Sequence, residues 1–121
     1  MKTIQTTGKR KPAVARATVK EGSGNIYINN KSLDVYETEI ARVKIKEPVR
    51  LAPEVADDLD IEVNVSGGGF MGQADASRTA IAKGLVEWSE DEEIYKKFKE
   101  YDETLIKSDT RQKESKKPGG R

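Results

Sequence analysis

The segment from residue 60 to residue 88 constrains the fold of this chain most strongly. Residues 60–66, DIEVNVS, alternate apolar and polar side chains, which is the pattern of a strand with one buried face. Three glycines follow, Gly67–Gly69, and residues 73–88 then repeat apolar or small residues at helical spacing. A strand that leads through a glycine turn into a long helix predicts a sheet with a helix packed on its apolar face.

The N-terminal part of the chain also predicts strands. Residues 13–20, AVARATVK, alternate in the same way, and Ile26–Ile28 is a second short apolar run after a Gly-Ser-Gly-Asn turn. We therefore expect a hairpin over residues 13–29. Ser32 is placed to cap a short helical turn over residues 33–38.

The middle and the C-terminal part predict further elements. Residues 41–46, ARVKIK, alternate, and we expect them to be extended because a helix there would carry charge on all sides. A short helix is expected to begin near Pro48, since proline fits the first turn of a helix. A last helix is expected to begin at Ser89, which would form a capping box with Glu92.

These elements predict one α+β domain over residues 1–106, a two-layer sandwich in which a small sheet carries helices on one face. The sequence loses its periodicity after Ile106, and residues 107–121 are expected to form an extended basic C-terminal tail.

The charge of the chain is unevenly distributed. Lys and Arg number 22 against 21 Asp and Glu, so the formal net charge is +1. Residues 1–20 nevertheless hold six positive and no negative side chains, and residues 107–121 hold six positive and two negative ones. Basic ends on an acidic middle favour a polyanionic partner such as a nucleic acid. The alternative is that the charged ends are only solvated.

The missing residue types exclude several classes of protein. The chain contains neither Cys nor His, which excludes disulfides, thiolate or imidazole catalysis and Cys-ligated metal sites. The acidic group at Asp57, Asp58 and Asp60 lacks the spacing of a calcium loop, so we expect no metal and no cofactor. The N-terminus lacks an apolar signal region, and no apolar run is long enough to span a membrane.

The glycine turn and the helix after it form the most informative candidate site. Glycines allow the backbone to approach another molecule closely, and a helix N-terminus favours anions. Gln73, Arg78 and Lys83 lie on this helix and could bind phosphate, ribose or a base edge. The alternative is a tight structural turn followed by ordinary surface and packing residues.

The whole segment GGGFMGQADASRTAIAKGL resembles the signature of the small-subunit ribosomal protein nine family. The matching positions are Gly67, Gly68, Gly69, Gln73, Ala76, Arg78, Ala80, Ile81, Ala82, Lys83, Gly84 and Leu85. The start, TGKRKPAVARATVKEGSGNIYIN, and the end, DTRQKESKKPGGR, are also similar to this family. The Lys-Lys-Pro-Gly motif and the ARVKIKEPVRLA segment resemble its archaeal and eukaryotic members.

The resemblance implies a fold and a function. The implied fold is shared with the second domain of another small-subunit ribosomal protein, S-five, and includes a left-handed β-α-β crossover. The implied function is translation: the protein is a structural, non-enzymatic constituent of the cytoplasmic ribosome. The resemblance also implies that the protein binds ribosomal RNA in the head of the small subunit, beside other head proteins. The family's C-terminal tail is directed towards the peptidyl-site tRNA. This sequence stops at Arg121, where the family continues, so we expect the tRNA-contacting residues to lie outside it.

We expect the RNA-binding residues to form three groups. The first group is one basic side of the domain and comprises Lys9, Arg10, Lys11 and Arg16. The second is a rigid phosphate-binding turn with the helix after it, and comprises Gly67, Gly68, Gly69, Gln73, Arg78 and Lys83. The third is an extended C-terminal strip of Arg111, Lys113, Lys116, Lys117 and Arg121.

Two other functions remain open at this stage. One is a small-molecule kinase whose glycine turn holds a nucleotide phosphate, although the chain is short and lacks the Gly-Ser-Ser pattern of such enzymes. The other is a free-standing RNA chaperone that uses the same basic surfaces.

Overall fold

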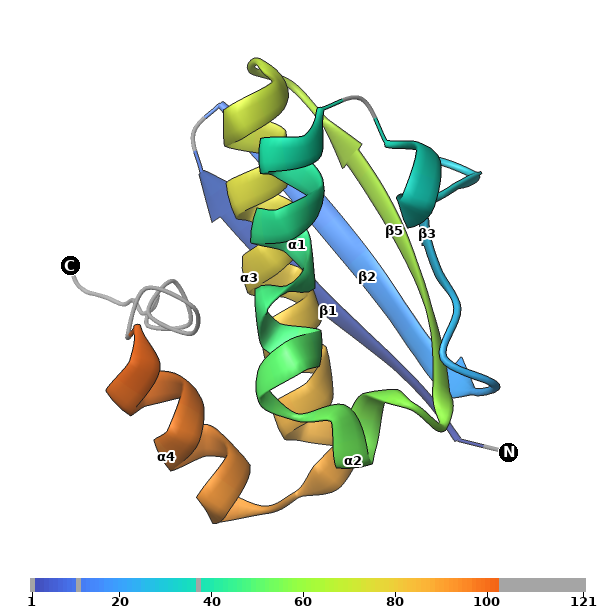
Figure 1. Ribbon diagram of the computed structural model, residues 1–121, viewed down its shortest axis with the longest axis vertical. Coiled ribbons are helices and arrows are strands. Elements are labelled where there is room, and N and C mark those ends of the chain that lie inside the picture. Colours follow the sequence, from blue (N-terminus) through green and yellow to red (C-terminus); the bar gives the residue numbers. More distant parts are fainter. Residues whose placement is uncertain (1, 11, 37, 103–121) are drawn as a thin grey trace, which may run out of the picture.

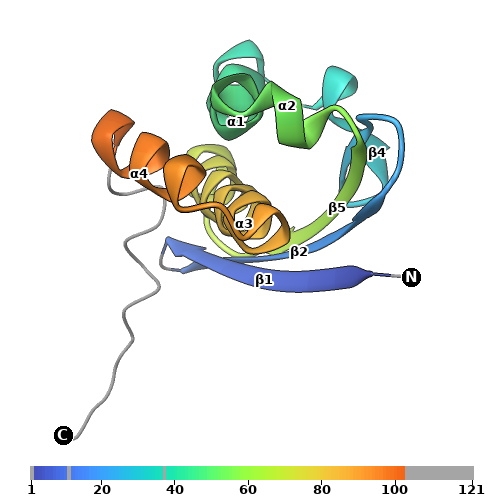
Figure 2. The same cartoon turned by 90° about the horizontal axis from the view of Figure 1, so that it is seen from below.

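The molecule has two layers, a curved sheet and a set of helices on one of its faces (Figures 1 and 2). The computed structural model describes residues 2–10, 12–36 and 38–102. The predicted α+β sandwich, with helices on one side of a small sheet, is confirmed. No helix in these described ranges is both long and apolar enough to cross a membrane.

The sheet has five strands in the order β1-β2-β5-β3-β4. Strand β3 pairs with β5 in parallel, and the other neighbours pair antiparallel. The strands are β1 (Thr3–Arg10), β2 (Ala13–Glu21), β3 (Ile26–Ile28), β4 (Lys31–Ser32) and β5 (Leu59–Ser66).

The helical layer contains one long central helix, α3, which packs on β1 and β2 and is flanked by α1. Helix α4 lies against the outer side of α3 (Figure 2). The helices are η1 (Leu33–Val35, a 3-10 turn), α1 (Glu39–Leu51), α2 (Pro53–Ala56), α3 (Phe70–Ser89) and α4 (Glu92–Tyr101).

The connection from β3 through α1 to β5 is a β-α-β crossover between neighbouring parallel strands. In Figure 1 the helices lie in front of the sheet, both strands run upward, and the chain moves leftward from β3 to β5. This crossover is therefore left-handed, against the usual right-handed rule. It agrees with the crossover implied by the family resemblance.

Small residues allow α3 to lie unusually close to the sheet. The side of β2 that faces the helices carries Ala13, Ala15, Ala17 and Val19, all fully buried. A Cβ placed on Gly84 of α3 would lie 2.7 Å from Val19 Cγ2, and one placed on Gly8 of β1 would lie 2.2 Å from the Ala76 carbonyl oxygen. Side chains at these two glycines would push the helix off the sheet.

The predicted hairpin over residues 13–29 is wrong, because β5 lies between β2 and β3. Strand β2 instead pairs with β1, which the sequence did not predict, and Thr6 of β1 pairs with Ala17 of β2. The strand β1 lacks a strong apolar alternation: Thr6 and Gly8 are the residues that it buries against the helices, with Ile4 partly buried.

The prediction that residues 41–46 are extended is also wrong, because they lie in α1. The buried residues of this helix are Ala41, Ile45 and Pro48, at the i, i+4, i+7 spacing of one helical face. The helix begins after Thr38, whose side-chain oxygen accepts the Ala41 N–H at 3.1 Å. Pro48 lies in the last turn of this helix rather than at the start of a new one.

The predicted start of the last helix at Ser89 is wrong as well. Ser89 ends α3, and α4 begins after Asp91, whose carboxylate accepts the Glu93 N–H at 2.9 Å. The strand over residues 60–66, the long helix over residues 73–88 and the Ser32 cap are confirmed. The predicted tail over residues 107–121 lies outside the described residues.

Candidate nucleic-acid interface

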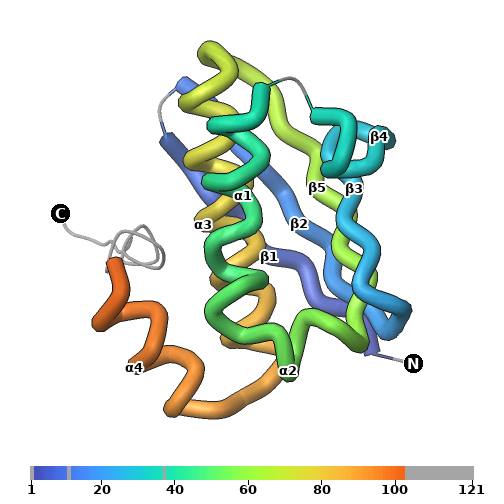
Figure 3. Tube along the Cα trace, in the orientation of Figure 1, coloured from blue at the N-terminus to red at the C-terminus, as the bar shows by residue number. Residues whose placement is uncertain are grey.

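Three segments that are distant in sequence meet at one end of the molecule. The start of β2, the first turn of α1, and the glycine turn that leads from β5 into α3 lie together there (Figures 1 and 3). A Cβ placed on Gly67 would lie 2.6 Å from the Pro12 carbonyl oxygen, so the glycine turn and the β1–β2 turn are in direct contact. Arg10 and the glycine turn, which belong to two of the three predicted RNA-binding groups, are thus brought to the same end.

The glycine turn has a backbone conformation that other residues rarely adopt. Gly67 and Gly68 have φ angles of 84° and 68°, in the left-handed region, whereas Gly69 has an ordinary φ of −96°. A Cβ on Gly69 would meet open space, so this part of the backbone is accessible. The three glycines therefore serve two purposes: the first two shape the turn, and the third leaves it uncovered.

Gln73 holds the glycine turn from the first turn of α3. Its Nε2 donates to the Gly67 carbonyl oxygen at 3.3 Å, and its Oε1 accepts the Tyr36 hydroxyl at 3.5 Å. The amide therefore has intramolecular partners, and the structure supports the alternative in which Gln73 stabilises the turn.

The N-terminus of α3 is open to an anion. Its N-cap residue is Gly69, which has no side chain to accept the first amides of the helix. These amides and the helix dipole leave partial positive charge next to the accessible glycine. Phe70 and Met71, in the same turn, are 51% and 41% exposed.

Two basic side chains share one acidic partner beside this turn. Arg10 Nε lies 3.7 Å from Asp75 Oδ2, and Lys44 Nζ lies 3.1 Å from Asp75 Oδ1. We call Arg10, Lys44 and Asp75 the Asp75 cluster. It joins β1, α1 and α3, and two cations around one carboxylate leave a net positive charge at the surface.

Lys9 and Arg16 lie on the face of the sheet that the helices leave open. Arg16 is paired with Thr7 on one side and Asn64 on the other, and both residues are exposed on this face. Neither cation has an ion-pair partner within residues 2–10, 12–36 and 38–102. Arg10 lies opposite Ala13, on the helix-covered side. The expectation that all these cations share one side is therefore wrong for Arg10.

Arg78 is buried, which argues against a direct phosphate contact. The residue is 5% exposed, its Nε donates to Glu47 Oε1, and its Nη2 donates to Asp102 Oδ2 at 2.8 Å. We call Glu47, Arg78 and Asp102 the Arg78 clasp. Sequence position alone placed Arg78 on the helix but did not reveal that this side faces α1 and α4.

Lys83 is half-buried along the edge of the sheet. Its Nζ donates to the Thr7 carbonyl oxygen of β1 at 2.7 Å. The remaining predicted site residues lie outside the described residues: Lys11, Arg111, Lys113, Lys116, Lys117 and Arg121.

Sequence reasoning missed Lys44, because it took residues 41–46 for an extended segment. The helical spacing of Ala41 and Ile45 behind Thr38, a good N-cap residue, was the signal that could have placed Lys44 on α1. Reasoning from sequence also missed the exposed apolar side chains at this end, among which Ile40 is 70% exposed.

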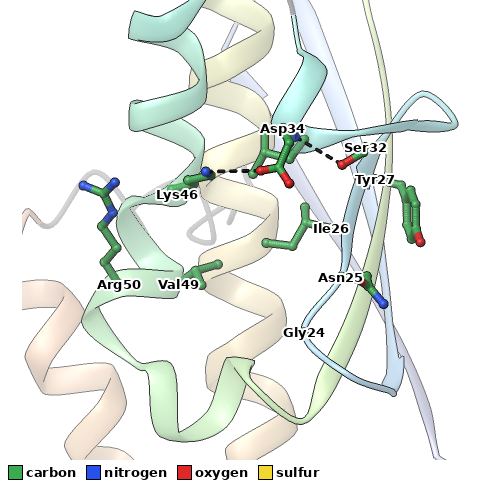
Figure 4. Close-up of a pocket in the computed structure, with 10 residues that line it drawn as sticks. Gly24, Asn25, Ile26, Tyr27, Ser32, Asp34, Lys46, Val49 and Arg50 are labelled. Atoms are coloured by element: carbon green, nitrogen blue, oxygen red, sulfur yellow. Dashed lines mark hydrogen bonds and ion pairs between the residues drawn. The ribbon is translucent and has the colours of Figure 1, made fainter.

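A cavity of about 310 Å³ lies between β3, η1 and α1 (Figure 4). Lys46 and Asp34 form an ion pair across one side of it at 3.4 Å. Ile26 points from β3 towards α1, and Val49 lies on α1 below the ion pair (Figure 4). The glycines of residues 67–69 are not among its lining residues. This hollow therefore gives no support to a nucleotide pocket at the glycine turn.

Comparison with known proteins identifies the family. The family model described as ribosomal protein S9/S16 matches residues 8–121. A protein of Methanothrix thermoacetophila is 52% identical over 99% of this chain and 91% of its own length. A protein of Thermoplasma volcanium is 55% identical, over 98% of this chain and 89% of its own. A protein of Halobacterium salinarum is 52% identical over 95% of this chain and 88% of its own length. All three are named small ribosomal subunit protein uS9, and none is named as an enzyme. The chain belongs to the ribosomal protein S9/S16 family.

Proposed function

We propose that this chain is a structural constituent of the small ribosomal subunit and binds ribosomal RNA through the end of the molecule around the glycine turn. Membership of the S9/S16 family gives the ribosomal role. The observation that supports this surface is the convergence of the glycine turn, the uncapped α3 N-terminus and the Asp75 cluster at one end. No enzymatic activity is part of the proposal.

The proposed contacts are mainly to the RNA backbone. Lys9, Arg10, Lys44 and Arg16 are long cations that suit phosphates, and the accessible backbone at Gly69 suits a close approach. Gln73 and Arg78 belong to the supporting structure instead, because both have intramolecular partners. Lys11 would extend the same basic group.

The C-terminal segment is the second proposed RNA-binding element. Residues 107–121 carry six positive and two negative side chains. The family resemblance implies that this segment is directed towards the peptidyl-site tRNA. We assign Arg111, Lys113, Lys116, Lys117 and Arg121 to ribosomal RNA contacts. We also propose that the chain lies in the cytoplasmic ribosome and contacts neighbouring proteins of the subunit head.

The test replaces Lys9, Arg10 and Lys11 with alanine in the full chain. The affinity for a transcript of the small-subunit head RNA is measured by filter binding over a range of KCl concentrations. We expect about ten-fold weaker binding or more, and a salt dependence that is shallower by about 2 to 3, because each lost phosphate contact removes about 0.7–0.9 from the slope.

The matched control replaces Lys96, Lys97 and Lys99 of α4 with alanine. These exposed lysines lie away from the glycine turn (Figure 1), and the change in charge is the same. An equal loss in both variants would mean that only the total charge matters, and would contradict the proposed surface. Co-sedimentation with small subunits at moderate salt separates this proposal from a free-standing RNA chaperone, which would not travel with them.

A further inference from the structure

The face of the sheet that the helices leave open carries a small hollow between β3 and β5. Its volume is about 190 Å³, and it is lined by Tyr27, Asn30, Glu62, Val63 and Asn64. Helices α1 to α4 all lie on the other face of the sheet (Figure 2). Within the described part of the chain the hollow is therefore uncovered, and it offers an aromatic ring, two amides and a carboxylate.

Tyr27 supplies the aromatic ring. It lies opposite Glu62 in the parallel pairing of β3 with β5, and it is 37% exposed. Figure 4 shows its side chain pointing away from α1, whereas that of its neighbour Ile26 points towards the helix. A tyrosine ring that stands beside a surface hollow, outside the core, can stack on the flat face of a nucleobase.

The amides beside the ring have unused hydrogen-bonding capacity. The side chains of Asn30 and Asn64 make no hydrogen bond within residues 2–10, 12–36 and 38–102. Asn29 differs: its side chain accepts the Val65 N–H at 2.8 Å and donates to the Val65 carbonyl oxygen at 3.1 Å. These two bonds hold the turn after β3 against β5, so that Asn30 is presented at a fixed place at the edge of the hollow.

Two charged side chains flank the hollow. Arg16 of β2 is paired directly with Asn64 of β5, and it is exposed on the same face of the sheet. Glu62 has Lys20 Nζ at 3.4 Å from its Oε2, and its side chain is still 53% exposed. Arginine suits a phosphate, whereas a carboxylate only accepts hydrogen bonds and favours a base that carries an amino group.

We propose that this hollow binds one unpaired nucleobase of the RNA. The base stacks on Tyr27, its exocyclic amino group donates to Glu62, and its phosphate lies next to Arg16. The proposal deepens the proposed function and rests on it, because the RNA is taken to be ribosomal RNA. It adds the reading of a base to contacts that are otherwise made to the RNA backbone.

The first test compares Tyr27→Leu with Tyr95→Leu in the full chain. Tyr95 lies on α4 and is 42% exposed, so each change removes one ring of similar exposure. For Tyr27→Leu we expect about five- to a hundred-fold weaker binding of the head RNA transcript, because stacking is lost, and an unchanged salt slope, because no phosphate contact is lost. Tyr95→Leu should bind like the wild type, and Tyr27→Phe, which keeps the ring, should bind nearly as well.

The second test titrates the protein with two single-stranded RNAs, hexacytidylate and hexauridylate, and follows the amide signals by ¹⁵N NMR. The side-chain amide signals of Asn30 and Asn64 should shift. Cytosine presents an amino group where uracil presents a carbonyl oxygen, so we expect hexacytidylate to bind about three-fold tighter or more. Glu62→Gln should abolish this preference, because an amide both donates and accepts hydrogen bonds.

The outcomes separate this site from the proposed function. If the wild type binds the head RNA but Tyr27→Leu and Tyr95→Leu bind it equally well, the base site is wrong and the proposed function stands. The site is also wrong if neither hexanucleotide shifts the signals of Asn30 and Asn64. If the wild type fails to bind the head RNA, the proposed function is wrong, whereas the titration still decides whether the hollow takes a base.

Discussion

The Asp75 cluster and the Arg78 clasp lie one helical turn apart on α3 and are built in opposite ways. Helix α1 supplies a partner to each, with Lys44 reaching Asp75 and Glu47 reaching Arg78. In the cluster two cations share one carboxylate near the surface, and in the clasp two carboxylates share one buried cation. The first arrangement leaves positive charge for a partner molecule, and the second uses its charges to hold the protein together.

The comparison shows that the charge of a side chain does not by itself indicate whether the side chain stabilises the fold or binds a partner. Arg10 and Arg78 are both arginines paired with aspartate, yet the side chain of one is 55% exposed and that of the other is 6% exposed. Coulombic attraction is weak where water screens it and strong where water is excluded. Burial therefore decides which of the two contributes to stability and which is available for binding.

The largest expected effect is on stability and comes from Arg78→Met. Two carboxylates would remain without their shared cation in a partly buried site, so we expect the free energy of unfolding to fall by about 2–4 kcal/mol. The same change at Arg10 should cost less than about 1 kcal/mol, because that pair is exposed to solvent. Urea unfolding of the two variants measures both values.

A triple variant identifies the cause of that loss. Combining Arg78→Met with Glu47→Gln and Asp102→Asn removes all three charges and should recover part of the stability. If Arg78→Met and Arg10→Met unfold at the same urea concentration, the contrast between the cluster and the clasp does not hold.

A smaller effect, a gain in RNA affinity rather than a loss of stability, is expected for Asp75→Asn. This change frees Arg10 and Lys44 from their shared carboxylate, and we expect about three- to ten-fold tighter binding to head RNA at low salt. The salt slope should become steeper. Filter binding at two salt concentrations measures this, with Asp91→Asn on the far side of the molecule as control. Weaker binding would mean that Asp75 is needed to orient the two cations.

The smallest effect concerns a carboxylate that belongs to neither group of charges. Asp60 accepts the backbone N–H groups of Ser23 at 3.0 Å and Asn25 at 3.1 Å. These two hydrogen bonds, that of Ser23 first, lower the pKa of Asp60 below its ordinary value. Asp60 therefore contributes stability above pH 4 or so, and the contribution is lost as the pH falls through the lowered pKa.

The corresponding measurement is urea unfolding of Asp60→Ala and wild type at pH 7 and near pH 2.5. We expect a difference of about 0.5 kcal/mol at pH 7 that shrinks at low pH, because the wild-type carboxylate is then protonated too. Asp58→Ala, an exposed neighbour, should show no such difference. A difference that is the same at both pH values would rule out the ionised carboxylate as its source.

Much of the fold follows from local patterns in the sequence. The strand over residues 60–66, the glycine turn and the helix after it were all predicted, because each depends on short-range periodicity and on backbone freedom. Strand β1 and helix α1 were not. Strand β1 has little apolar alternation, and residues 41–46 fit both a strand pattern and a helix pattern. Packing of β1 on β2 and of α1 on α3 decides their conformation.

For the candidate site, the sequence determined the family, the basic N-terminal residues and the glycine turn whose first two positions require a positive φ. Only the tertiary structure decided what each charged side chain contacts. It brought Lys44 to Asp75 and buried Arg78 between Glu47 and Asp102, residues 31 and 24 positions away in sequence. The physical reason is that burial and ion pairing depend on which elements pack together, and the left-handed crossover that sets α1 beside α3 leaves no local trace in the sequence.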